Sequence, residues 1–368
     1  MARPTKPFGR LGFLITVIIV LCHHATPARA LGRSYAQYEH FFPAWEHIIK
    51  DQLQRDCQEP LTNYRNRSEP APQVGYQVIG CILETMPEFR KAELAAAAVI
   101  LGLAPTVLQL LSASYLDTAV LAFRRPGLAL LLSMSSSGVR PLTATEYDDF
   151  ITKMGTDPFR TNFGRPRSFW APRLVSLAEY AIAAGAVANN AYLAYQLSIW
   201  AVCTFAPAND FLPAVWTAAC VAIHIVGYVA ARLRIKVDER DDMEAVGLQR
   251  GPWHRILNEL TPTPWQSRLK VNPGKETGWF LVLVSTLYVG TALQAFYGTI
   301  ILSSLVFLSV RDSAIVVIRL VASALFARGV LIYELAGFRT DKEGFGPSEK
   351  SYSAVELEQL NRDRGFNR

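Results

Sequence analysis

The sequence has few charged residues and lacks the common catalytic motifs. Only 18% of its 368 residues are charged, below the soluble-domain average of about 25%. It has no HExxH, GxSxG or Walker-type motif and no GxGxxG after a strand, so we expect a non-enzymatic protein without a metal or cofactor. The net charge is +6, but the basic residues flank apolar blocks instead of alternating with aromatic residues. This pattern argues against a nucleic-acid partner.

Charge is scarcest in long apolar blocks. The mean hydropathy is positive, at +0.17, and each block reaches about the 20 residues that a membrane-spanning helix needs. Short polar linkers join the last four blocks into two pairs. The sequence therefore predicts an all-α membrane protein with about five transmembrane helices, one lone span plus two helical hairpins. The predicted spans are 93–114, 174–205, 211–233, 278–310 and 313–338.

The N-terminus has the three parts of a secretory signal peptide. A basic start is followed by an apolar run of about a dozen residues, too short for a stable span, and by Ala28-Arg29-Ala30. We predict that residues 1–30 are cleaved; an uncleaved anchor is the alternative. Cleavage would make residues 31–92 a small luminal or extracellular ectodomain and direct the chain to the secretory pathway and the plasma membrane.

Cysteine is also scarce. The chain has five cysteines, of which only Cys57 and Cys81 lie in residues 31–92. On the oxidising side, a Cys57–Cys81 disulfide would contribute about 3 kcal/mol in the chain-entropy model; two independent thiols are the alternative. The loop between them holds the only N-x-S/T sequon, at Asn66, which predicts a glycosylated ectodomain.

One further apolar stretch, residues 117–138, is nearly long enough to cross a bilayer. Arg124 and Arg125 lie in its middle and would each cost about 2.5–3.5 kcal/mol near the bilayer centre. Pro126 then divides the stretch into two short halves. We therefore predict that residues 118–134 form a kinked interfacial or re-entrant segment whose arginines contact anionic headgroups at the cytoplasmic face.

The distribution of basic residues supports the same topology. With five spans, loops 115–173 and 234–277 are cytoplasmic and rich in Lys and Arg, whereas the outer turns have almost none. A further crossing at residues 117–138 would place both basic loops outside. The tail, residues 339–368, is then cytoplasmic, and its polar composition predicts disorder.

Polar residues within the predicted spans are the candidate functional residues, because such residues are costly in a bilayer and often functional. Glu179 could instead have a structural or snorkelling role, and His224 could be a hydrogen-bonded core residue. Arg319 is too deep to snorkel easily, so we expect it to pair with Asp312, Glu179 or His224. The four candidates are Glu179, Asn190, His224 and Arg319.

Residues 101–141 read LGLAPTVLQLLSASYLDTAVLAFRRPGLALLLSMSSSGVRP. With Cys81 and the charged residues 88–93, they resemble a group of uncharacterised multi-pass membrane proteins of filamentous ascomycete fungi. The similar features are a luminal cysteine pair, a first span of the LGLxPTxLxLL type and a following RRP. The resemblance covers the first half of the chain and implies a topology without an activity.

Two functions fit these features. The first is a protein of the secretory pathway or cell surface that organises, senses or binds partners, including other membrane proteins. The second is a small-solute or ion transporter or channel that uses the intramembrane polar residues. Many transporters are built from internal repeats, and none is visible here, so the sequence favours the first function.

Overall fold

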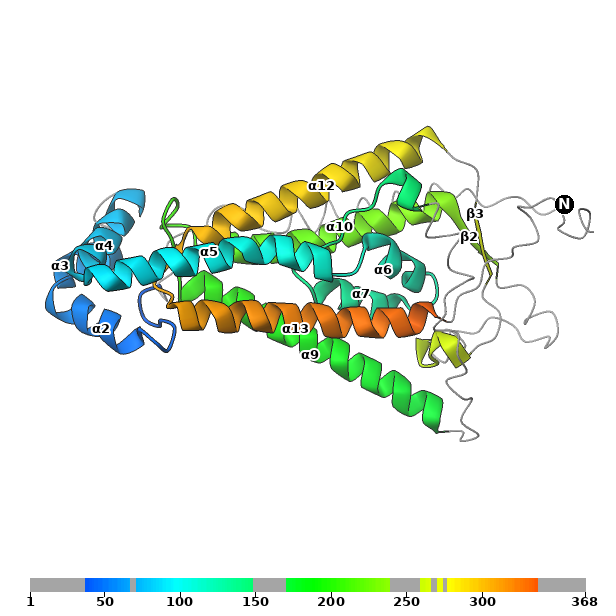
Figure 1. Ribbon diagram of the computed structural model, residues 1–368, viewed down its shortest axis with the longest axis horizontal. Helices are drawn as coiled ribbons and strands as arrows, with labels where there is room; N and C mark the ends of the chain where they lie inside the picture. Colours follow the sequence, from blue (N-terminus) through cyan, green and yellow to red (C-terminus); the bar gives the residue numbers. More distant parts are fainter. Residues whose placement is uncertain are drawn as a thin grey trace, which may run out of the picture.

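The computed structural model describes residues 37–66, 71–147, 170–238, 259–265, 270–273 and 277–336. The predicted signal peptide and C-terminal tail lie outside these residues. Long helices run along the molecule's longest axis, and a small helical domain lies at one end (Figure 1). The long helices are α5 (Glu88–Leu111), α9 (Ala171–Ile199), α10 (Leu212–Arg234), α12 (Gly278–Ser303) and α13 (Val310–Leu335).

Four helices in the described part of the chain are long and apolar enough to cross a membrane: α5, α10, α12 and α13. The chain is therefore a membrane protein. Helix α9 has 29 residues but is not among the four. Its polar side chains, among them Glu179, Asn189 and Asn190, lower its mean hydropathy.

Several helix boundaries differ from the predicted spans, and two of the differences have clear physical reasons. Helix α5 begins at Glu88, because Pro87 precedes it with extended backbone and the acidic Glu88 suits the first turn. Helix α12 ends at Ser303, because the next residues form strand β4 (Leu305–Val306). The apolar sequence after Ser303 therefore forms the turn that leads into α13.

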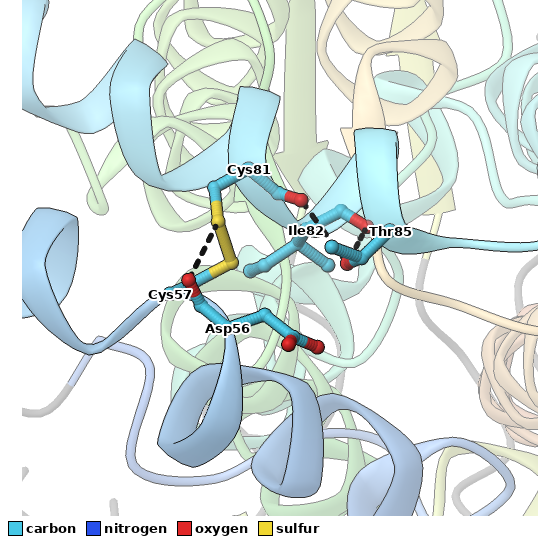
Figure 2. Close-up of a disulfide and its surroundings, with 5 residues drawn as sticks. All are labelled: Asp56, Cys57, Cys81, Ile82 and Thr85. Atoms are coloured by element: carbon cyan, nitrogen blue, oxygen red, sulfur yellow. Dashed lines mark hydrogen bonds between the residues drawn. A yellow bond between two sulfur atoms is a disulfide. The ribbon is translucent and has the colours of Figure 1, made fainter.

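The small domain consists of α2 (Glu46–Arg55), α3 (Gln58–Asn66) and α4 (Ala71–Thr85), and we call it the ectodomain after its predicted location. Trp45, Ile49 and Leu53 are buried in its core, as their helical spacing suggests. The predicted disulfide is confirmed: Cys57, between α2 and α3, is bonded to Cys81 in α4 (Figure 2).

The ectodomain packs directly on the helical bundle. Its Phe41 ring makes an edge-to-face contact with Phe307, at 5.9 Å between ring centroids. The backbone N–H of Ala44 donates to Asp312 Oδ2 at 3.3 Å. Residue 307 lies in the turn between α12 and α13, so the ectodomain covers the bundle end where that turn lies.

Two small antiparallel sheets were not expected in an all-α protein. Strand β1 (Val202–Cys203) pairs with β4, which joins the turns after α9 and α12. Strand β2 (Ile235–Asp238) pairs with β3 (Lys270–Pro273) between α10 and α12, at the end far from the ectodomain (Figure 1). Successive long helices therefore run in opposite directions.

The stretch with the two arginines forms helices α6 (Tyr115–Ala122) and α7 (Pro126–Met134), of 8 and 9 residues. Each is far shorter than the roughly 20 residues needed to cross a bilayer. Most α6 side chains are buried, and so are Leu128 and Leu132 of α7. The leucines thus pack mainly against protein, whereas an interfacial segment would place them in the acyl layer. We call residues 115–138 the re-entrant segment, after the predicted topology.

Candidate functional site

Arg124 and Arg125 lie in the turn between α6 and α7. Helix α6 ends at Ala122, and Pro126 starts α7 at a first-turn position, where its missing N–H costs no helical hydrogen bond. The two arginines therefore point away from a tight corner instead of lying along one helix. Their side chains are 7% and 0% exposed.

The Arg125 guanidinium is held by three segments of the chain. Its Nη1 donates to Glu179 of α9 and, at 2.8 Å, to Glu334 Oε1 of α13. Nη2 donates to Ser176 Oγ at 2.6 Å, and Nε donates to the Glu259 carbonyl at 2.8 Å. The Tyr180 ring centroid lies 5.4 Å from its central carbon, a cation–π distance. We call Arg124, Arg125, Glu179, Glu259 and Glu334 the charge cluster.

The two acidic partners of Arg125 differ in their hydrogen bonds. Glu334 is fully buried, and Thr263 donates to it through both its hydroxyl and its backbone N–H. Glu179 accepts from Arg125 with Oε2, but its Oε1 is buried without a hydrogen-bond partner in the part of the chain that the structure describes.

Glu259 closes the corner from a third segment. Its Oε1 accepts from the N–H groups of Gly127 and Leu128 at 3.0 and 3.2 Å, and from Tyr180 at 2.6 Å. A carboxylate at this position satisfies free N–H groups at the start of α7 and interacts favourably with its helix dipole.

The predicted contact of Arg124 and Arg125 with lipid headgroups is wrong. Both side chains are buried, Arg125 against Glu179 and Glu334, and Arg124 donates to the Thr261 carbonyl at 2.9 Å. A buried arginine is tolerated when carboxylates and hydrogen bonds compensate its charge. The sequence contains both carboxylates, but it does not show that α9 and α13 place them beside Arg125 in the folded protein.

A second polar group lies deeper in the bundle, where the re-entrant segment turns back after α7. Ser137 Oγ donates to Asn190 Oδ1 at 2.7 Å, and Asn190 Nδ2 donates to the Met134 carbonyl at 3.0 Å. Gln294 of α12 donates to the Ser137 carbonyl at 2.9 Å. Ser136 bonds Ser112 at 2.6 Å, so three long helices contact this turn.

The depth of the turn follows from its contacts on α9. Arg125 contacts Glu179 and Ser137 contacts Asn190, and these two α9 residues lie about 16 Å apart along a helix. A bridge between Ser114 and Arg140 brings the start of the segment beside the residues that follow it. The chain thus enters the bundle and returns, with non-helical backbone at residues 135–138.

The other two candidate residues lie apart from the charge cluster. His224 Nδ1 is 2.7 Å from Thr118 Oγ1, so this buried histidine contacts the re-entrant segment. Arg319 donates to Asn189 Oδ1 at 2.9 and 2.7 Å and to Gln196 Oε1 at 3.1 Å. The expected pairing of Arg319 with Asp312, Glu179 or His224 is wrong, because two amides on α9 and the Tyr192 ring surround its guanidinium.

The four candidate residues thus lie at separate places, His224 beside Thr118 of α6. Glu179 lies in the charge cluster, Asn190 at the inner turn, and Arg319 nearer the ectodomain, between α9 and α13. The sequence reasoning did not select Glu259, Glu334, Ser137 or Gln294. For Glu259 and Glu334 a signal was available: the adjacent Arg124 and Arg125 have no acidic residue beside them in the sequence, so their charges require glutamates from other segments.

No group of three or more His, Cys, Asp or Glu side chains in the described residues could hold a metal ion. Residues 237–247 read VDERDDMEAVG and are rich in carboxylates, but they fall almost entirely outside the described residues. Comparison with known proteins found no matching family model, curated protein or solved structure. The candidate site is therefore interpreted from its own geometry.

Proposed function

We propose that this chain is a small-solute or ion transporter or channel, without enzymatic activity, whose re-entrant segment controls passage through the bundle. The observation that carries the proposal is the non-helical turn at residues 135–138, bonded by Asn190 and Gln294 within the bundle. Non-helical backbone at membrane depth occurs only where protein buries it or where it lines a water-filled cavity. Discontinuous helices of this kind form the binding sites of many transporters.

The gathering of polar side chains supports transport over the organising role that the sequence favoured. Asn190, Ser137 and Gln294 are all nearly buried, although Leu or Val would stabilise a purely structural bundle at lower cost. An organising role remains the alternative, and the direct contact between ectodomain and bundle is the feature that favours it.

The proposed topology has five spans, with α9 as the additional one. The ectodomain then lies on the luminal or extracellular side and the C-terminus in the cytoplasm, as the positive-inside rule favours. Cleavage of residues 1–30, glycosylation at Asn66 and a plasma-membrane location belong to this proposal. Asn66 is exposed at the end of α3. The similarity to fungal multi-pass membrane proteins fits the same topology.

The transport proposal is tested with purified protein in liposomes. Gradients of K⁺, Na⁺, Cl⁻ and H⁺ serve as probes, and we expect flux above that of empty liposomes for at least one. Asn190→Leu should abolish this flux, because it removes the bond to the inner turn. Leu177→Ala is the control. Leu177 lies on α9 and is 67% exposed, so this variant should keep the flux. If the protein is correctly folded and the flux of all four ions equals that of empty liposomes, the result would favour the organising role.

The topology is tested by glycan mapping and a C-terminal tag. Glycosidase should shift the mass of the wild-type chain but not that of Asn66→Gln. A tag after Arg368 should react with antibody only after the membrane is permeabilised. Labelling of intact cells would overturn the proposed orientation.

A further inference from the structure

The charges of the cluster do not balance. Arg124 and Arg125 supply two positive charges, whereas Glu179, Glu259 and Glu334 supply three negative ones when all are ionised. Helix α7, which packs against α9, has no charged side chain. Glu259 is only partly buried, but the buried Glu179 and Glu334 both accept from the same nitrogen of Arg125. If both were ionised, this one guanidinium would face two buried negative charges, and a buried charge without compensation costs several kcal/mol.

The hydrogen bonds show which carboxyl is least suited to carry that charge. Glu334 accepts from Arg125 and Thr263 with both oxygens engaged. The Glu259 carboxylate accepts from two backbone N–H groups and from Tyr180. Glu179, which is 5% exposed, has one oxygen on Arg125 and the other, Oε1, without a donor. An ionised carboxylate is an acceptor on both oxygens, whereas a protonated one is also a donor.

We infer that Glu179 carries a proton at neutral pH and that this carboxyl is a proton-binding site of the protein. The proton comes from solvent and forms one O–H bond, and no other bond changes. With Glu179 neutral, the five side chains of the cluster sum to zero.

Release of that proton would change the contacts of Arg125. Its Nη1 donates to both Glu179 and Glu334. An ionised Glu179 would therefore compete with Glu334 for this nitrogen, and the two carboxylates would repel each other. Protonation would thereby control how firmly α13 is held to the α6–α7 corner. This consequence rests on the proposed transport function and identifies H⁺ as the coupling ion; the protonation itself does not depend on transport.

Infrared difference spectroscopy tests the protonation directly. The wild-type protein at neutral pH should show the carbonyl stretch of a protonated carboxylic acid, shifted in D₂O, and Glu179→Gln should lose this band. The control Glu88→Gln changes a carboxyl that is 88% exposed and should keep the band. A band that persists in Glu179→Gln, or its absence from the wild-type protein, would overturn the inference whatever the flux assay shows.

A second measurement remains informative if Glu179→Gln folds poorly. Glu179→Asp should shift the frequency of the band instead of removing it. In the wild-type protein, unfolding at neutral pH should release one proton, so the unfolding temperature should fall as pH rises. If Glu179→Gln folds, its unfolding temperature should not show this pH dependence and should equal that of the wild-type protein at neutral pH. Glu334→Gln should have a lower unfolding temperature at neutral pH. Equal losses in the two variants would contradict a neutral Glu179.

Discussion

Arg125 Nη1 and Glu334 Oε1 lie 2.8 Å apart, although 209 positions separate the two residues in the chain. Both side chains are fully buried. The pair joins the turn of the re-entrant segment to the last described helix, and Thr263 extends the contact to a third segment. The corner is therefore assembled by tertiary contacts, and each partner depends on the others for compensation of its charge.

Removing Arg125 should destabilise the whole bundle. Arg125→Met leaves Glu334 buried without its counter-ion, which typically costs about 3–5 kcal/mol. Urea or thermal unfolding in detergent measures the loss. Arg55→Met is the control, because Arg55 pairs with Asp51 on the exposed surface of α2 and such pairs contribute about 0–1 kcal/mol. Equal effects of the two substitutions would contradict a structural role for the cluster.

The sequence predicted the apolar helices well, because bilayer thickness fixes their length and composition. It also rejected a span at residues 117–138, since two arginines and a proline have a high cost at membrane depth. The Cys57–Cys81 pair followed from having only two candidates in one segment. Each of these inferences used local information.

The contacts of the polar residues could not be predicted in the same way. Hydropathy shows that Arg125 is costly in lipid, but not whether water, headgroups or protein compensates the cost. The pairing with Glu334 depends on how α13 packs beside the re-entrant segment. Arg319 illustrates the same limit, because its partners are the neutral amides of Asn189 and Gln196, which no charge count would select.

The close approach of residue 138 to α5 gives a second prediction. A Cβ atom at Gly138 would lie 2.7 Å from the Leu108 backbone carbon and 2.9 Å from its oxygen. Gly138→Ala should therefore displace the inner turn and cost about 1–3 kcal/mol, as overpacking usually does. Gly290→Ala is the matched control, because nothing lies within 4 Å of a Cβ there. Unfolding in detergent should show a loss only for Gly138→Ala.

The contact between Thr118 and His224 should contribute to stability. Thr118→Val removes the hydroxyl group 2.7 Å from Nδ1 and leaves a buried polar atom without this partner, at a cost of about 1–3 kcal/mol. A double-mutant cycle with His224→Leu isolates the pair, and we expect the second change to cost less in the Thr118→Val background. Thr286→Val, at an exposed threonine bonded to its own helix, is the control. Strict additivity in the cycle would exclude an interaction.

The disulfide should stabilise the ectodomain by about 3 kcal/mol, as expected for a loop of this length. Cys57→Ser, Cys81→Ser and the double variant should all lose the same amount, because each removes the same bond. The rate of proteolysis in the ectodomain measures the loss. A reducing agent should accelerate cleavage of the wild-type protein and have no further effect on the double variant. Unchanged cleavage of the wild-type protein under reduction would contradict the prediction.

Tyr38 predicts how the ectodomain responds to alkaline pH. Its ring is 3% exposed, and its hydroxyl has no hydrogen-bond partner among the described residues. Burial, with a smaller effect of Tyr64, raises the pKa of Tyr38 above its usual value. Above pH 10, roughly the pKa of an unfolded tyrosine, the unfolded chain loses this proton while the folded chain keeps it. Ectodomain stability should therefore fall as pH rises through this range.

Tyr38→Phe should remove that part of the alkaline loss. At neutral pH the variant should be as stable as the wild-type protein or more so, because phenylalanine keeps the ring contact with Tyr64 and buries no unpaired hydroxyl. Proteolysis of the ectodomain from neutral to alkaline pH measures both effects. If both proteins lose stability equally above pH 10, roughly the usual pKa of tyrosine, another group is responsible. If the variant is less stable at neutral pH, the hydroxyl has a favourable contact after all.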